Sequence, residues 1–178
     1  MIPFASANCS AFPEETQVEI LSLAELQAPI VCQGLAYWDK LRAGRRYPAR
    51  DEIRVRDIAA LLKHMVVAKG IDGGEDFLLS IVGDEVGRCY RAPIMHRRLS
   101  EIAVDLPKTA ARWLPIYRQT LQSGLPVAVL VKVGLEAPEI NFSHAETVCL
   151  PFGPEGGPAD FIATFGQHTA RSGLPRFS

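Results

Sequence analysis

The sequence lacks any apolar run long enough to cross a membrane. A transmembrane helix needs about 20 consecutive, predominantly apolar residues, and the apolar runs here are much shorter. Residues 1–12 also lack the basic start and the continuous apolar stretch of a secretory signal. We therefore expect no membrane partner and a cytoplasmic location.

A large charge of one sign is also missing, since 19 basic and 20 acidic side chains leave a formal net charge of −1. Such a chain exerts no long-range attraction on nucleic acid or anionic lipid. The densest basic cluster consists of Lys40, Arg42, Arg45, Arg46, Arg50, Arg54 and Arg56. Acidic side chains interleave with it and neutralise much of it, namely Asp39, Asp51, Glu52 and Asp57. We expect a solvated helix end here and no nucleic-acid partner.

Cysteine is scarce, and long gaps separate its four positions, Cys9, Cys32, Cys89 and Cys149. No C-x-x-C pair occurs, and no histidine stands at metal-ligand spacing from a cysteine, so the pattern predicts no metal site. In a reducing compartment we expect free thiols that pack as small hydrophobic side chains.

The common catalytic motifs are absent. The sequence contains neither a G-x-S-x-G elbow nor an H-E-x-x-H pair, which removes the commonest hydrolase and zinc chemistries. Gly83 and Gly87 faintly resemble a phosphate loop, but Asp84 and Glu85 would repel the phosphate. We interpret the two glycines as a strand end and a packing contact, and we predict no catalytic residue and no enzyme.

The composition that is present is typical of a globular protein, with 48% hydrophobic and 22% charged residues and a mean hydropathy of +0.08. At 178 residues the chain fits one domain with an adequate core. We assign this domain to residues 28–168, between a variable N-terminal extension at 1–27 and a C-terminal tail at 169–178. A short apolar run at residues 20–26 is compatible with a strand or a helical turn.

Apolar residues at helical spacing predict two long and two short helices. The first long helix starts at Pro29 and stops at Gly44. The second runs over 105–123, with Asp105 as its cap and a kink before Pro115. The short helices are expected after Asp57, with Ile58, Leu61 and Leu62 facing the core, and from Asp84 toward Tyr90.

Runs of β-branched and aliphatic residues predict five strands, which are Met65–Lys69, Phe77–Val82, Val127–Val133, Glu146–Phe152 and Asp160–His168. Asp72-Gly73-Gly74 joins the first two with the turn chemistry of a hairpin. The glycine- and proline-rich segment 153–158 joins the last two. This order predicts an α+β fold with an antiparallel sheet and its helices on one face.

The element order and several short motifs resemble the PAS fold, and specifically a bacterial PAS-like family of short stand-alone proteins. The matching residues are 35–102 and 149–165. The most specific parts are Tyr37-Trp38 with Gly44-Arg45-Arg46-x-Pro48-Ala49-Arg50, the strand Phe77 to Gly83, and Arg98-Leu99-Ser100-Glu101-Ile102. The sequence departs from the family pattern at His96, where a small turn residue is expected. The resemblance implies a PAS-like five-stranded antiparallel sheet with helices on one face, an N-terminal helix, and a pocket between sheet and helices.

Candidate ligand-binding residues follow from the position of that pocket. Two arginine pairs bracket the connection that should cover it, and a guanidinium there could hold a carboxylate or phosphate. Trp113 and Tyr117 fit a core role or a ligand platform. The predicted pocket residues are Arg88, Tyr90, Met95, His96, Arg98, Trp113 and Tyr117.

PAS relatives include haem and flavin sensors, so both are candidate cofactors. A haem ligand would have to be one of His64, His96, His144 and His168, and no spacing singles one out. Cys89 lacks the Asn-Cys-Arg motif of light-sensing flavin proteins, so we interpret it as a buried structural thiol. The cofactor is left open.

The first long helix has features of an interaction surface. If it packs on the domain only through Trp38, then Tyr37 and Leu41 form an exposed apolar patch, which favours a homodimer or another protein partner. Two functions fit, a sensor that binds a small molecule and a ligand-free adaptor that regulates a signalling protein. A small enzyme fits least. Because we recognise no output domain, we expect any signal to pass by intermolecular contact.

Overall fold

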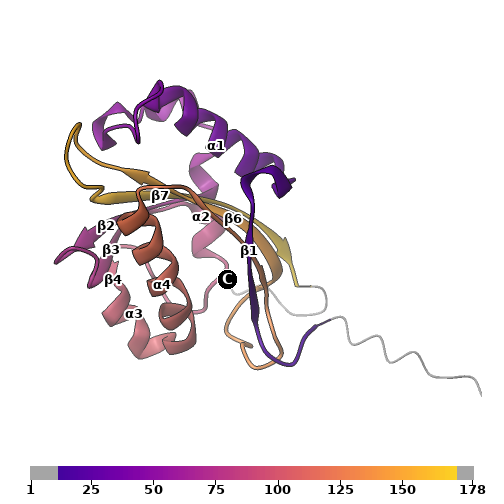
Figure 1. The fold of residues 1–178 in the computed structure, drawn as a ribbon. Coiled ribbons are helices and arrows are strands. Elements are labelled where there is room, and N and C mark those ends of the chain that lie inside the picture. Colours follow the sequence, from indigo (N-terminus) through magenta and orange to yellow (C-terminus); the bar gives the residue numbers. More distant parts are fainter. Residues whose placement is uncertain (1–11, 172–178) are drawn as a thin grey trace, which may run out of the picture.

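The computed structural model describes residues 12–171 and shows an α+β fold built on one antiparallel sheet (Figure 1). The helices are α1 (Pro29–Arg42), α2 (Asp84–Gly87), α3 (Leu99–Asp105) and α4 (Pro107–Ser123). The strands are β1 (Gln17–Leu21), β2 (Met65–Ile71), β3 (Asp76–Val82), β4 (Arg97–Arg98), β5 (Val127–Lys132), β6 (Phe142–Phe152) and β7 (Phe161–Ala170). They lie in the order β1-β5-β6-β7-β2-β3-β4.

All five predicted strands are present with shifted ends, and they correspond to β2, β3, β5, β6 and β7. The predicted strand number is wrong, because two further strands lie at the edges of the sheet. β1 comes from the N-terminal extension and pairs with β5, whereas β4 has two residues and pairs with β3. Nearly all of β1 is exposed, so it lacks the alternation of a half-buried strand. β7 also extends two residues into the predicted tail.

The helices differ from the prediction at three places, and one of these is α2, which ends at Gly87 and does not continue toward Tyr90. Asp105 does not cap the long helix, because it ends α3, and Leu106 alone separates α3 from α4. Pro107 then starts α4, which is assigned as helix through Pro115. The predicted short helix after Asp57 is replaced by 3-10 turns at Val55–Ile58 and Leu62–His64.

Other local predictions agree with the structure. Ile58 and Leu61 are buried as expected, while Leu62 is half-buried. Gly83 is a packing contact, since an added Cβ would lie 2.2 Å from the Leu62 carbonyl oxygen. The basic cluster is partly neutralised by ion pairs of 2.7 Å from Arg42 to Asp39 and from Arg45 to Glu52.

Three of the four cysteines lie within the described residues. Cys89 and Cys149 are buried free thiols, Cys32 is an exposed one, and Cys9 lies outside the described residues. Among residues 12–171, no helix is long and apolar enough to span a bilayer. The same residues contain no cluster of three or more metal-ligating side chains.

The sheet is covered by helices on both faces (Figure 1), and β7 shows how the two sides are separated. Neighbouring residues of a strand point to opposite faces. Phe165 faces α1, because a Cβ on Gly34 would lie 2.5 Å from its ring. Thr164 faces the other way, where it lines a cavity together with Tyr117 of α4. The cavity therefore lies between the sheet and α3 and α4.

Candidate functional site

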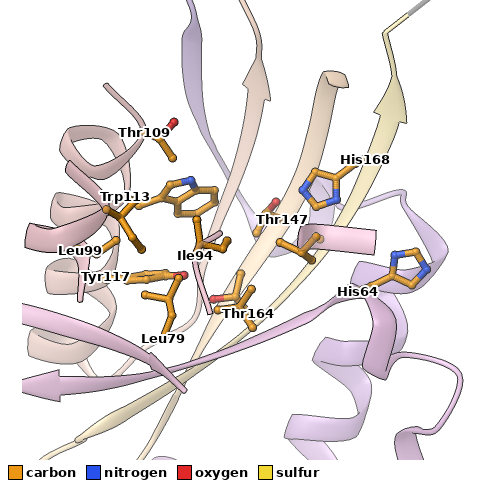
Figure 2. A pocket seen from close by; sticks show the side chains of 14 residues that line it. His64, Leu79, Ile94, Leu99, Thr109, Trp113, Tyr117, Thr147, Thr164 and His168 are labelled. Carbon is orange, nitrogen blue, oxygen red and sulfur yellow. The ribbon is translucent and has the colours of Figure 1, made fainter. Parts of the chain in front are cut away.

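A cavity of about 40 Å³ lies between the sheet and the helices on the face opposite α1 (Figure 2). Leu99 and Ile102 of α3 and three residues of α4 form its roof. Its floor is the middle of β6 and β7. Its remaining walls come from residues around the turn before β2, from β3, from α2 and from the loop before β4, namely His64, Val66, Leu79, Val86 and Ile94.

The floor of the cavity is polar because of strand alternation and register. Thr164, Gly166 and His168 alternate along β7 and therefore share one face. Thr147 of β6 pairs directly with Gly166 and joins them on that face. A Cβ on Gly166 would lie 3.0 Å from His168 Cε1 and 3.1 Å from Thr147 Oγ1. Glycine therefore keeps the centre of the floor open.

Two aromatic side chains of α4 form part of the roof. Trp113 and Tyr117 are one helical turn apart, and their ring centroids lie 5.7 Å apart. The Tyr117 hydroxyl is paired with Thr164, whose own hydroxyl donates to Cys149 Sγ at 3.6 Å. Burial raises the pKa of Tyr117 and raises the pKa of Cys149 to about 12. Both groups are therefore uncharged at neutral pH.

Several polar atoms at the cavity have no hydrogen-bond partner. Across residues 12–171, five buried side-chain polar atoms are unpaired, and four belong to residues that line this cavity. These four are His64 Nδ1, Thr109 Oγ1, Thr147 Oγ1 and His168 Nδ1. An unpaired buried polar atom costs about 1–3 kcal/mol. Such atoms are rare in proteins, so four on residues around one cavity make this cavity the candidate functional site.

The two histidines of the cavity are uncharged at neutral pH. Desolvation, and secondarily the nearby His64, lower the pKa of His168 to about 4. Desolvation and then Lys63 lower the pKa of His64, while Glu85 partly opposes them. Since no lining residue is Asp, Glu, Lys or Arg, the whole cavity wall is free of ionic charge at pH 7.

A second, larger hollow adjoins the cavity and shares His64 and His168 with it. We call it the outer cleft, with a volume of about 300 Å³ and a lining of His64, Glu85, Arg88, Cys89, Asn141, Phe142, His168 and Ala170. Its charged pair, Arg88 and Glu85, lies 3.5 Å apart. Burial and then the charge of Glu85 raise the pKa of the Cys89 thiol to about 12, which keeps it unreactive.

The structure brings three of the seven predicted pocket residues to these two hollows. Trp113 and Tyr117 line the cavity, and Arg88 lines the outer cleft. Tyr90 is buried outside both linings, where it forms a bridge with Ile140 and its hydroxyl pairs with Trp113. Tyr90 thus holds a roof residue in place.

Met95, His96 and Arg98 do not line the cavity, because the pairing of β4 with β3 directs this segment outward. Met95 is 48% exposed, and the other two are also exposed. His96 has a φ of 60°, and its backbone N–H donates to the Leu79 carbonyl at 2.7 Å. This left-handed conformation explains why a small turn residue is expected there.

The predicted pocket residues do not include the polar floor and the roof threonine, which are Thr109, Thr147, Thr164 and His168, and His168 is predicted only as a candidate haem ligand. The available signal was the alternation Thr164-x-Gly166-x-His168 in an otherwise apolar strand. Of the four haem-ligand candidates, His64 and His168 lie at the cavity, whereas His144 is exposed like His96. A cavity of about 40 Å³ is far too small for a haem macrocycle.

The proposed partner helix is α1, and it packs on the sheet through more than Trp38. The Trp38 indole N–H donates to the Pro151 carbonyl at 2.8 Å. Tyr37 and Leu41 are half-buried against the core, and the Tyr37 hydroxyl accepts from the Arg54 N–H at 2.9 Å. These two side chains therefore do not form the exposed patch on which the dimer prediction was based.

Comparison with known proteins places this architecture in a family. The model of the PAS domain family matches residues 27–163, which is most of the chain and includes every element from α1 to β6. Searches of curated proteins and of solved structures gave no significant match. PAS domains are generally sensory or interaction modules rather than enzymes. The chain belongs to the PAS domain family.

Proposed function

We propose that this protein is a non-enzymatic sensory module that binds a small molecule in the cavity between the sheet and α3 and α4. The observation that carries the proposal is that four unpaired polar atoms belong to residues that line a largely apolar cavity. Ligand pockets commonly combine an apolar lining with a few convergent polar groups. A ligand that forms hydrogen bonds with these atoms removes the cost of leaving them unpaired.

The size of the cavity sets what binding must do to the structure. One water needs about 10–15 Å³, so a cavity of about 40 Å³ holds only water-sized guests as it stands. A larger ligand must widen it by moving the roof helices or the two histidines. Ligand binding then favours a conformation different from the empty one, which is what a sensor requires.

The signal leaves by contact with another protein. β7 connects the two faces, since Thr164 touches the cavity and the adjacent Phe165 packs against α1. A shift of β7 on ligand binding therefore changes how α1 packs against the sheet. We propose the outer side of α1, opposite the buried Trp38, as the surface that a second copy or a signalling partner contacts. The free thiols fit a reducing cytoplasm.

The proposal is tested by native mass spectrometry of freshly purified protein. We expect a co-purifying small molecule, which is absent in Gly166→Val because the added side chain fills the floor between Thr147 and His168. Gly87→Val is the matched control, since an added Cβ at Gly87 meets no atom within 4 Å. A protein with no bound molecule under any growth condition would contradict the sensor.

A ligand-free adaptor is the second candidate, and exposed apolar side chains on the edge strand favour it. Val18 and Ile20 of β1 are 40% and 57% exposed, and the following Leu23 is 41% exposed. An exposed strand edge can pair with another chain. An adaptor requires no guest in the cavity, so Gly166→Val would bind partners as well as the wild type does.

A further inference from the structure

The lining of the cavity discriminates between classes of ligand by charge. It contains eight apolar or aromatic side chains, three threonines, two histidines and one glycine, and none of these carries an ionic charge at pH 7. A buried ion without a partner is far more costly than a buried neutral polar group. An anion or a cation in this cavity would meet hydroxyls and imidazoles but no opposite charge.

The charged groups beside the two histidines are found at the outer cleft or next to His64 in the sequence. Glu85 and Arg88 line the outer cleft and form a pair of opposite sign. Lys63 and Glu85 are the charged neighbours that act on His64, and His64 is the neighbour that acts on His168. The outer cleft thus presents a polar entrance, and the imidazoles mark the boundary with the uncharged interior.

We infer that the ligand is an uncharged molecule with an apolar body and a hydrogen-bonding end, and that it enters from the outer cleft past His64 and His168. This inference rests on the proposed function of the cavity. The hydrogen-bonding end lies against the floor, where Thr147 Oγ1 and His168 Nδ1 are unpaired. The apolar body lies under Leu99 and Ile102 of the roof.

The two unpaired atoms of the floor can pair with a hydrogen-bond donor or with an acceptor of the ligand. A threonine hydroxyl both donates and accepts, and a neutral imidazole nitrogen does one or the other according to its tautomer. Alcohols, amides and carbonyl compounds therefore fit this floor. Because the histidines also line the larger hollow of about 300 Å³, turning their rings aside joins the two spaces and makes room for a ligand.

Three probes of matched chain length test the class of ligand at pH 7.5, namely 1-hexanol, hexanoate and hexylammonium. We expect 1-hexanol to shift the backbone NMR signals of β6 and β7 with at least tenfold higher affinity than either ion. An ion that binds there as tightly as 1-hexanol would overturn the inference. If none binds although a co-purifying molecule is found, the inference fails and the proposed function stands. If there is also no co-purifying molecule, both fail.

A matched pair of threonine variants tests the contact with the floor. Thr147→Val removes one unpaired hydroxyl, and we expect it to weaken 1-hexanol binding about fivefold, the equivalent of about 1 kcal/mol. Thr120→Val is the control, because its hydroxyl is buried but already donates to the Ile116 carbonyl at 2.9 Å outside the cavity. Equal affinity in the two variants would contradict the proposed orientation.

The route is tested by the rate of association. Ala170 is exposed and lines the outer cleft, so Ala170→Trp should slow 1-hexanol association at least tenfold by narrowing the entrance. Thr169→Trp is the control on the preceding residue, which points to the opposite face of β7. An unchanged association rate in Ala170→Trp would overturn entry through the cleft.

Discussion

The two faces of the sheet are packed in different ways, although they share the strands β6 and β7. On the α1 face, Gly34 allows the helix to approach Phe165 closely, and the Trp38 indole N–H is paired with Pro151. On the other face, Gly166 lies in the floor of a cavity that no side chain fills. One face is thus closed and satisfied, and the other is hollow with unpaired polar atoms.

This difference separates the part of the fold that provides stability from the part that can respond. Close-packed contacts resist rearrangement, since interiors pack as densely as organic crystals. A hollow with unpaired polar groups forfeits both dispersion contacts and hydrogen bonds. The α1 face therefore anchors β7, and the proposed sensor would change conformation on the cavity face.

The largest predicted effect is on the closed face. Phe165 is 2% exposed, and Phe165→Ala should lower the free energy of unfolding by about 3–5 kcal/mol, because a large buried ring leaves a void. Urea denaturation measures this loss. Phe161→Ala is the control on the same face, where the ring is half-buried beside Arg50 and Lys69. A smaller loss at Phe165 than at Phe161 would contradict the comparison.

The second prediction concerns pH and the hollow face. The pKa of His168 is lowered to about 4, so the unfolded chain takes up a proton near its ordinary value of about 6.5 while the native protein does not. Stability is therefore lost as pH falls from about 7 to 4, by at most about 3 kcal/mol for this residue.

Carboxylates also affect stability at acidic pH, so the contribution of His168 is measured by comparing the wild type with a variant. The pKa values of Glu52 and Glu136 are also lowered, and their protonation removes stability at the acidic end. Urea unfolding of the wild type and of His168→Gln between pH 7 and 4 isolates the histidine. We expect the variant to lose less stability over this range. Identical slopes would show that His168 is not held neutral.

The third prediction compares two glycines in helices. Gly34→Ala gains about 1 kcal/mol of helix propensity, but its Cβ would lie 2.5 Å from the Phe165 ring. Overpacking of this kind costs about 1–3 kcal/mol, so we expect a net loss of up to about 2 kcal/mol in thermal unfolding. Gly87→Ala meets no atom and should be neutral or stabilising. A gain in stability at both positions would show that α1 packs loosely against Phe165.

The helices and the central strands were easier to predict from sequence than the floor of the cavity. The stripe of α4 predicted Trp113 and Tyr117 as inward-facing residues, and the apolar runs predicted the central strands. The cavity floor could not be predicted in this way, because threonine is a common strand residue. Only the register that pairs Thr147 with Gly166 shows that it shares the hollow with His168. That register forms between strands joined across residues 153–160 and has no local signature.

Two other errors have local physical causes. The predicted pocket residues Met95, His96 and Arg98 follow from the resemblance, but the two-residue pairing of β4 with β3 turns them to solvent. The sequence does not distinguish a strand from a turn at β1, because Val18 and Ile20 are exposed and give no buried face to recognise. Short edge pairings of this kind depend on neighbouring strands more than on their own sequence.

The smallest predicted effect is a difference in sign between two threonines. Thr147 and Thr120 are both almost fully buried, with 2% and 0% exposure. The Thr120 hydroxyl is paired with Ile116, and Thr120→Val should cost about 1 kcal/mol by leaving that bond unmade. The Thr147 hydroxyl is unpaired, so Thr147→Val should raise the free energy of unfolding by up to about 1 kcal/mol.

Urea denaturation of both variants without ligand measures this difference. A polar group that is kept at a cost to stability is typical of a binding site. If Thr147→Val is destabilised as much as Thr120→Val, its hydroxyl is already satisfied in solution, by water or by a rotated neighbour. The hollow face would then be as complete as the closed one, and the asymmetry on which ligand binding depends would disappear.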